Sequence, residues 1–271
     1  MDYCFVTAFY DIGRSCWDNF TRTSDSYLQF FALLCQMKIP IVVYIDSKHL
    51  DAVQKICSDN RPDEVFTQVV AMDEQFLKNN IKSWGYIKRE REIMNEERYK
   101  VAIRHRNHCP ETKYPEYNCI NHAKVDFVKY TIENVVSPEV KYFGWVDFGY
   151  VRSTDLMPDD RTFRYDVLKN DHVNMIYNNP VDERDKDPVY TLQFAPEKIM
   201  GGFWFGSKDS VLKYWGIYHE ALNNLHSMGI ADDDQAVVIH AYMHQKEGTI
   251  KLWENRMLGS KGWFVGFLLF R

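Results

Sequence analysis

An amphipathic segment between two apolar segments near the N-terminus restricts the fold more than any other feature of the sequence. Residues 3–9 and 41–45 have the apolar, β-branched and aromatic composition of buried strands. Between them, apolar side chains recur at helical spacing, namely Tyr27, Phe30, Phe31 and Leu34. Two strands joined by a helix form a βαβ unit, in which the strands are parallel and the crossover is right-handed. We therefore expect an α/β fold, Rossmann-like, with a mostly parallel central sheet.

The alternation of strands and helices continues to about residue 150 and then becomes irregular. The first part predicts strands at 65–70 and 142–146, helices at 48–57, 86–104 and 121–135, and a loop at 105–121. The second part predicts strands at 172–177 and 199–205, then helices at 207–225 and 231–242. No repeat or low-complexity linker separates the two parts. We therefore predict one domain over residues 1–271, with a βα half at 1–150 and a mixed half at 151–271.

Composition argues against several classes of protein. The net charge of -5 leaves no basic excess for a phosphate backbone, so no nucleic-acid partner is expected. The six cysteines form no C-x-x-C pair and are expected to be reduced thiols. Neither a signal peptide nor an apolar run of about 20 residues is visible, so we expect a cytoplasmic protein. Membrane association stays open, because the apolar stretch 262–270 fits a core strand, a membrane-surface contact or the cut end of a longer chain.

A single carboxylate follows the apolar segment 142–146. Asp147 stands at the carboxyl end of this predicted inner strand, which is where open α/β sheets bind their ligands. A plain strand-to-turn junction capped by Asp147 is the structural alternative. Mg²⁺ and Mn²⁺ bind through one or two carboxylates together with phosphate oxygens. Asp147 is therefore a candidate metal ligand.

The same sheet edge is expected to gather side chains suited to a nucleotide. Aromatic rings there could stack on a base, Asp46 could accept hydrogen bonds from base or ribose, and nearby basic residues could neutralise a diphosphate. Each basic residue taken alone is more often a surface charge. The predicted nucleotide-binding residues are Thr7, Phe9, Tyr10, Arg14, Tyr44, Asp46, Lys124, Trp145, Asp147 and Arg152.

The second half contains a glycine pair and an acidic triplet. Gly201 and Gly202 would let a ligand approach the backbone beside the ring of Trp204, unless they form a bulge in a packed strand. The three acids at 232–234 exceed what one helix cap needs, so one of them could act as general base for a hydroxyl. The candidates are Asp232, Asp233 and Asp234. His240 and His244 are expected to be core or surface histidines, with His240 a minor metal candidate.

These segments together resemble the HtrL/YibB family of glycosyltransferases. The resemblance rests on residues 6–14, Arg22, Tyr27, 41–46, Lys124, 145–149, 201–206 and 233–235. It implies a GT-A fold and transfer of a sugar from a nucleotide donor, most often a UDP-sugar, to a surface glycan. It also implies that residues 1–150 bind the donor, and that residues 151–271 bind the acceptor through Gly202, Trp204 and Gln235.

Enzymes of this fold commonly hold a divalent metal on an Asp-x-Asp motif, and this sequence departs from that motif. Gly149 stands in place of the second Asp. A Mn²⁺ or Mg²⁺ ion would then rest on Asp147, the diphosphate and water, or on a distant ligand. Otherwise arginine and lysine side chains would carry the phosphate charge without a metal.

Three functions remain open from the sequence. The first is a hexosyltransferase that uses a UDP-sugar, with galactose as a guess, a glycan acceptor, and Asp233 or a neighbour as base of an inverting reaction. The second is a nucleotide-sugar or glycan-binding module that keeps the fold without activity, which the missing second Asp favours. The third is a metal-dependent phosphoesterase using Asp147 and the acids at 232–234.

Overall fold

Apolar segments from both halves of the sequence form one seven-stranded sheet in the computed structural model, which describes residues 1–245, 248–256 and 260–270. The strands are β1 (Tyr3–Phe9), β2 (Ile41–Asp46), β3 (Thr67–Met72), β4 (Tyr142–Val146), β5 (Val173–Tyr177), β6 (Ile199–Ser207) and β7 (Ile250–Glu254). Their order across the sheet is β3-β2-β1-β4-β6-β5-β7. β6 pairs antiparallel with both of its neighbours, and every other pairing is parallel. The prediction of an α/β fold with a mostly parallel sheet is confirmed.

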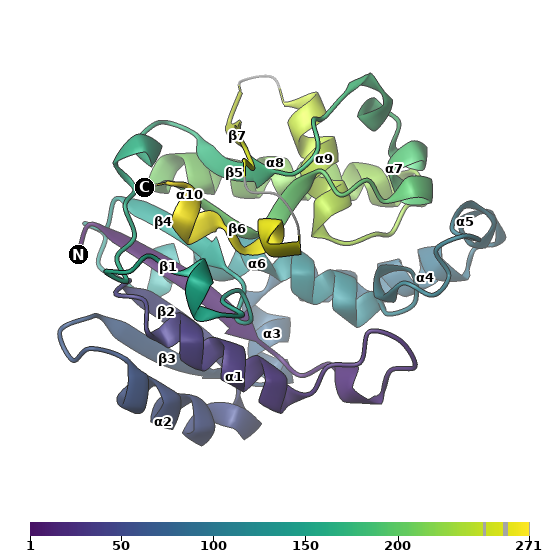
Figure 1. Ribbon diagram of the computed structural model, residues 1–271. Coiled ribbons are helices and arrows are strands. Elements are labelled where there is room, and N and C mark those ends of the chain that lie inside the picture. The colour runs from purple at the N-terminus through teal and green to yellow at the C-terminus, as the bar shows by residue number, and fades with distance from the viewer. Residues whose placement is uncertain (246–247, 257–259, 271) are drawn as a thin grey trace.

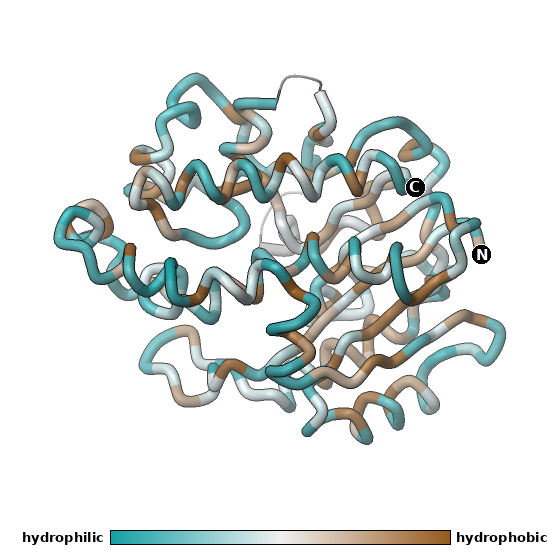
Figure 2. The backbone as a smooth tube through the Cα atoms, turned by 180° about the vertical axis from the view of Figure 1, so that it is seen from behind, coloured by the Kyte–Doolittle hydropathy of each residue, from teal (hydrophilic) through white to brown (hydrophobic). Residues whose placement is uncertain are grey.

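Helices cover both faces of the sheet (Figure 1). They are α1 (Ser24–Cys35), α2 (Leu50–Asn60), α3 (Glu74–Asn80), α4 (Ile87–Asn95), α5 (Glu97–Ala102), α6 (Pro115–Asn134), α7 (Pro188–Phe194), α8 (Lys208–Ser227), α9 (Asp234–His244) and α10 (Gly266–Leu269). α1, α2 and α10 pack on one face, whereas α3, α6, α8 and α9 contribute to the core on the other. Figure 2, seen from behind, shows the long helices α6 and α8 side by side over that second face.

The core consists of two apolar layers because the inner strands are buried on both sides. Along β1, Cys4 and Val6 point into one layer while Phe5 points into the other. The layer under α1 and α10 is rich in aromatic rings, and it requires a glycine at position 144. A Cβ atom there would lie 2.5 Å from the Phe5 ring. The strand pairing therefore depends on Gly144 as well as on apolar character.

The chain changes direction across the sheet at β1. β2 and β3 lie on one side of β1, whereas β4 lies on the other. In open α/β sheets, ligands bind outside the carboxyl ends of the strands at such a switch point. The segments that follow β1 and β4 are therefore the place to look for a site.

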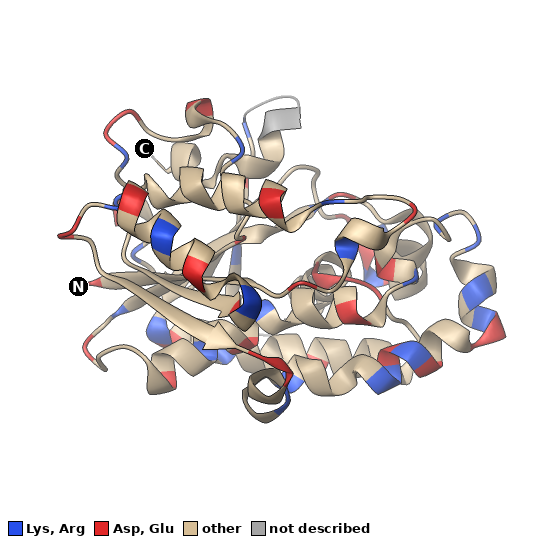
Figure 3. Cartoon of the chain, turned by 90° about the horizontal axis from the view of Figure 1, so that it is seen from below, with Lys and Arg blue, Asp and Glu red and all other residues tan. Residues whose placement is uncertain are grey.

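Two predicted boundaries between residues 86 and 135 were wrong. The segment 86–104 is two helices, because Glu96 adopts an extended conformation between α4 and α5. Charged residues of both signs occur along this segment (Figure 3). The predicted loop 105–121 ends early, because α6 begins at Pro115. Proline suits the first turn of a helix, where its missing N–H leaves no hydrogen bond unmade.

The apolar stretch at 262–270 forms short helices, so the strand that was one of its predicted alternatives is wrong. Its Phe267 and Phe270 side chains are buried, and their rings lie 5.3 Å and 6.3 Å from the ring of Phe203 on β6. This packing is that of a core segment. No helix in the described part of the chain is long and apolar enough to cross a membrane.

Candidate functional site

A cavity of about 300 Å³ opens at the carboxyl ends of β1 and β4. Phe9 and Tyr10 line it from the end of β1, and Asp147 lines it from the end of β4. α6 contributes Tyr117 and Lys124. The cavity therefore lies at the switch point of the sheet, where the topology predicts a ligand.

Asp147 is held in a fixed orientation at this cavity. Its backbone N–H donates to the carbonyl oxygen of Gly202 on β6 over 2.9 Å. Its Oδ1 atom accepts a hydrogen bond from Trp145 Nε1 over 2.7 Å and lies 3.2 Å from the ammonium group of Lys124. The side chain is still 42% exposed, so it can reach a ligand.

Lys124 joins Asp147 to the start of α9. Its Nζ atom lies 2.8 Å from Asp234 Oδ2, and both the lysine and Asp234 are buried. Burial alone would lower the pKa of Lys124, but the charges of Asp147 and Asp234 outweigh burial and raise the pKa above its usual value. Lys124 therefore remains a cation between two carboxylates at neutral pH.

Three arginines also line the first cavity, two from the segment between β1 and α1 and one from the loop after β4. Arg14 donates from Nη1 to the hydroxyl of Tyr27 over 2.7 Å, and Arg22 lies over the same ring at 5.3 Å. Arg152 lies 4.0 Å from the ring centre of Phe264. Desolvation, followed by the charge of Arg22, lowers the pKa of Arg152. The three guanidinium groups thus form a positively charged wall.

A second cavity, of about 310 Å³, adjoins the first and shares Arg14 and Tyr117 with it. Asp233 and Gln235 line it from the start of α9. Asp233 Oδ1 caps this helix by accepting from the N–H of Gln235 over 3.0 Å. Burial, with the charges of Asp234, Asp232 and Glu111, raises the pKa of Asp233 well above its usual value. A partly exposed carboxylate of increased basicity therefore faces the second cavity.

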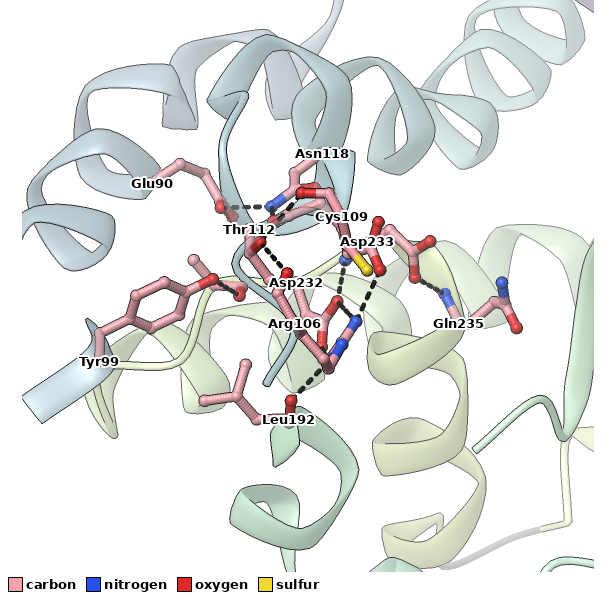
Figure 4. Close-up of polar contacts among 12 residues, drawn as sticks. Glu90, Tyr99, Arg106, Cys109, Thr112, Asn118, Leu192, Asp232, Asp233 and Gln235 are labelled. Carbon is pink, nitrogen blue, oxygen red and sulfur yellow. Dashed lines mark hydrogen bonds and ion pairs between the residues drawn. The ribbon is translucent and has the colours of Figure 1, made fainter. Parts of the chain in front are cut away.

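Asp232 is neutralised by a buried arginine (Figure 4). Arg106 donates to its two oxygens over 3.0 Å and 3.2 Å, and also forms an ion pair with Glu111 at 2.8 Å. The same guanidinium group bonds the carbonyl oxygen of Leu192 at the end of α7. Arg106 therefore fixes the segment before α6 to the start of α9, and it leaves Asp233 as the acid of the triplet without a cation beside it in the described residues.

Comparison with known protein families agrees with the resemblance found in the sequence. The model of a family described as "Bacterial protein of unknown function (HtrL_YibB)" matches residues 1–271. The chain belongs to the HtrL/YibB family. No curated protein matches the sequence of this HtrL/YibB chain.

Among solved structures, the HtrL/YibB chain is similar to core-mannan synthase A (CmsA/Ktr4) from Aspergillus fumigatus in its Mn/GDP form. The TM-score is 0.51 at 9% sequence identity, over 93% of this chain and 73% of the other. At this identity the likeness concerns the fold, and it confirms the predicted GT-A architecture.

Most of the predicted site residues of the HtrL/YibB chain lie at the two cavities. The first cavity is lined by Phe9, Tyr10, Arg14, Lys124, Trp145, Asp147 and Arg152. The second is lined by Asp232, Asp233 and Gln235, while Asp234 lies behind Lys124. Gly202 supports Asp147 from behind, because a Cβ atom there would lie 2.9 Å from Asp147 Oδ2.

Four predicted residues lie elsewhere, and the structure gives them other roles. Thr7 is fully buried within β1. Tyr44 is fully buried and shares a hydrogen bond with Thr131, so it packs in the core instead of stacking on a base. Asp46 caps the turn after β2 and lies near Lys48. Trp204 is 2% exposed against Tyr214 and offers no face to a sugar.

Several residues at the cavities were not predicted as site residues, among them Tyr117 and Phe20. Arg22 and Tyr27 line the first cavity and belong to the segments that carried the family resemblance. That resemblance was the signal that could have identified them. Arg106 and its ion pairs had no sequence signal, because Asp232 lies 126 residues further along the chain.

The donor set around Asp147 fits a divalent cation poorly. The described residues contain no group of three or more His, Cys, Asp or Glu placed to hold a metal ion. Asp147 and Asp234 both approach one point, and the Lys124 ammonium group already lies there. The Mn²⁺ or Mg²⁺ predicted at Asp147 would thus have one carboxylate that is already paired with Lys124.

His240, the minor metal candidate, has the character of a neutral core histidine. Its Nδ1 atom is buried without a hydrogen-bond partner in the described residues. Burial, and then the charge of His244, lowers the pKa of His240 to about 4.

Proposed function

We propose that the chain is a glycosyltransferase that moves a sugar from a nucleoside diphosphate sugar to a hydroxyl group of a glycan. The observation that supports this most is the pair of adjoining cavities at the switch point of the sheet. One is lined by three arginines and Asp147, and the other by Asp233. A donor and an acceptor must meet at a shared boundary, and Arg14 and Tyr117 provide that boundary.

The first cavity suits the donor. A diphosphate carries charge that guanidinium groups can bind through paired hydrogen bonds, and Arg14, Arg22 and Arg152 converge there. The rings of Phe9 and Tyr10 give a base an aromatic surface. UDP is the nucleotide that the family resemblance favours, with galactose as the first sugar to test.

The second cavity suits the acceptor. Phe20 lines it with a half-exposed ring and a left-handed backbone conformation, φ 58°. Ala195 lines the same cavity with φ 41°. Residues other than glycine adopt this conformation at a cost in free energy, and such residues are concentrated at functional sites. We assign to Phe20 an aromatic contact with a sugar ring of the acceptor.

Asp233 is the proposed base. The acceptor oxygen attacks the anomeric carbon, and the bond from that carbon to the diphosphate oxygen breaks. The nucleoside diphosphate leaves with the electron pair of that bond, while Asp233 takes the proton of the acceptor hydroxyl. The arginines stabilise the negative charge that develops on the leaving group. Asp232 and Asp234 are already paired with Arg106 and Lys124, so neither is as available for a proton. This arrangement favours inversion at the anomeric carbon.

Donor turnover and donor binding, measured together, test this function. Purified protein is incubated with a panel of UDP- and GDP-hexoses, and release of the nucleoside diphosphate is followed while calorimetry gives the affinity. We expect release from at least one donor, and an Asp233→Asn variant that binds this donor normally but releases little. Failure of the whole panel to bind or react would refute the proposal.

A nucleotide-sugar-binding module without activity is the alternative, and Gly149 in place of a second acid favours it. Binding without release or transfer in the same assay would support the module. A phosphoesterase fits the geometry less well. Lys124 separates Asp147 from Asp234, and Arg106 occupies Asp232, so these acids do not combine into one metal site.

A further inference from the structure

The ammonium group of Lys124 occupies the point where a metal ion would bridge two carboxylates. It lies 3.2 Å from Asp147 Oδ1 at the end of β4 and 2.8 Å from Asp234 Oδ2 at the start of α9. These are the two acids that a cation at the base of the first cavity would reach. A divalent ion at that point would have to displace a buried cation or lie against it, and like charges at such distances repel strongly.

The first cavity also contains the positive charge of three arginine side chains. Within the described ranges, Arg14, Arg22 and Arg152 form no ion pair with a carboxylate. Their side chains contact aromatic rings, a hydroxyl and a backbone carbonyl. By contrast, Lys124 is paired with both Asp147 and Asp234, a group that carries one net negative charge, and Asp11 at the cavity rim is paired with Lys48. The three guanidinium groups outweigh that charge and leave the cavity positive.

This excess matches the charge of a nucleoside diphosphate. Unpaired arginines repel one another, and binding of a polyanion relieves that repulsion. Burial, and after it the charge of Arg22, lowers the pKa of Arg152. Guanidinium groups bind phosphate oxygens in pairs, and aromatic contacts such as that of Arg152 with Phe264 fix their planes before the ligand arrives. The charge that a divalent ion commonly supplies is thus already present in side chains.

We propose that the first cavity binds the diphosphate of its donor through Arg14, Arg22 and Arg152 without a divalent cation, while Lys124 holds Asp147 and Asp234 in place of a bridging ion. This inference rests on the proposed function, because it concerns the donor of that reaction. It implies a metal-independent transferase in which arginine side chains stabilise the leaving group.

Calorimetry with UDP and GDP provides the test. Each nucleotide is titrated into the full chain after treatment with EDTA, and again with added Mn²⁺ or Mg²⁺. We expect the dissociation constant of the preferred nucleotide to change by less than about threefold between these conditions. Arg152→Gln and Arg22→Gln should each weaken binding by about 10- to 100-fold, since each removes charged hydrogen bonds. Arg164→Gln, at an exposed arginine outside both cavities and paired with Asp160, should leave binding unchanged.

The Lys124→Gln variant examines the bridging position directly. Removal of the ammonium group leaves Asp147 and Asp234 facing each other, so this variant should gain Mn²⁺ binding that the unmodified chain lacks, as measured by the electron paramagnetic resonance signal of free Mn²⁺. If the variant does not fold, the nucleotide titrations still decide.

Each outcome of the titrations has a distinct meaning. Equal affinity with and without the metal supports the inference. Nucleotide binding that disappears in EDTA and returns with Mn²⁺ or Mg²⁺ overturns it but leaves the proposed transferase intact. The absence of nucleotide binding under either condition removes the proposed function, and the inference with it.

Discussion

Asp147 combines a fixed orientation with exposure to the cavity, which makes it the most direct single-residue test of the site. Asparagine has the same shape and still accepts the hydrogen bond from Trp145, but it lacks the charge that pairs with Lys124. We expect Asp147→Asn to reduce donor turnover by about 10²-fold, because loss of the ion pair with Lys124 displaces groups that line the first cavity. Donor-dependent release of nucleoside diphosphate measures this effect, with the circular dichroism spectrum as the control for folding. Unchanged turnover would remove Asp147 from the chemistry.

Asp233 should give the reaction an unusual pH dependence. Burial and the neighbouring acids raise its pKa well above 3.8, and a general base must be deprotonated to act. The value of kcat should therefore fall as the pH decreases through this raised pKa, at a higher pH than for an ordinary aspartate. Asp233→Asn should abolish this acid limb together with most of the rate. An unaltered limb in that variant would assign it to another group.

The same residue should show opposite effects on activity and stability. An acid whose pKa is raised by folding stabilises the folded state below its unfolded pKa and loses that contribution as the pH rises through the folded pKa. At neutral pH, Asp233→Asn should thus unfold at the same or a higher temperature than the parent, because asparagine also caps α9. Asp233→Ala loses the cap and should cost about 1 kcal/mol, which denaturant titration measures.

Residues that line the cavities could be predicted where they end or follow a strand, and less well where they lie deeper within one. Asp147 and Arg14 come after the apolar segments, where a parallel sheet exposes side chains. Tyr44 and Trp204 lie inside strands buried on both faces, and the sequence pattern does not indicate which face receives a helix. Arg106 was missed because long-range ion pairs leave no local pattern.

At the scale of elements, β6 approaches both acids so closely that a side chain at Gly201 or Gly202 would displace them. A Cβ atom at Gly201 would lie 2.0 Å from Asp234 Oδ2, and one at Gly202 would lie 2.9 Å from Asp147 Oδ2. Gly201→Ala should therefore displace Asp234 from Lys124 and destabilise the fold by about 1–3 kcal/mol. Gly202→Ala should mainly reduce donor turnover by moving Asp147. Denaturant titration and the turnover assay separate the two effects.

Gly216 on α8 is the matched control for these substitutions. Apart from the adjacent residues and the backbone of α8, no atom of the described residues lies within 4 Å of a Cβ at this position, and the residue is in the interior of a helix. Gly216→Ala should stabilise the protein by about 0.5–1 kcal/mol, because alanine loses less backbone entropy in a helix. A loss of stability at Gly216 equal to that at Gly201 would contradict the steric explanation.

The bounds of helices and strands were predicted well where the apolar pattern was strongly periodic. The relative direction of strands and the breaks within helices were predicted less well. The apolar stripes of α1 and α8 and the apolar run of β4 gave nearly correct bounds. The antiparallel direction of β6 could not be predicted, because alternation of side chains is the same in either direction. The break at Glu96 left no proline or glycine signal.

At the scale of the molecule, both parts of the sequence contribute to one sheet and to both cavities. β4 pairs with β1 and with β6, so Asp147 stands between strands from residues 1–150 and 151–271. The division into donor and acceptor halves remains a prediction, and the second cavity draws residues from both. The sequence indicated the first cavity through its topology. It could not indicate the second, because that cavity forms where α6, α7 and α9 meet.

The buried carboxyl group of Glu90 connects α4, α6 and α8, and it should determine how the stability of the fold changes at low pH. Glu90 on α4 is fully buried, with Oε1 2.6 Å from His226 Nε2 on α8 and Oε2 accepting from Asn118 on α6 over 3.0 Å. Burial would raise the pKa of Glu90, but the adjacent imidazole groups of His122 and His226 outweigh it and lower the pKa from 4.5 to about 2. An acid whose pKa is lowered by folding stabilises the folded state at pH values above its unfolded pKa. That stability, on the order of 3 kcal/mol, is lost as the pH falls from about 4.5 to about 2.

Replacement of Glu90 by glutamine should therefore flatten the dependence of unfolding free energy on pH in this range and lower stability at neutral pH. Urea titrations at a series of pH values measure both effects. Glu92→Gln is the control, because Glu92 lies on the same helix, is half-exposed, and is 4.0 Å from Lys88 and 3.7 Å from Arg89. Its curve should follow that of the parent, since exposed ion pairs contribute little. If Glu90→Gln keeps the slope of the parent, the three helices are joined by packing alone, and acid unfolding begins elsewhere in the molecule.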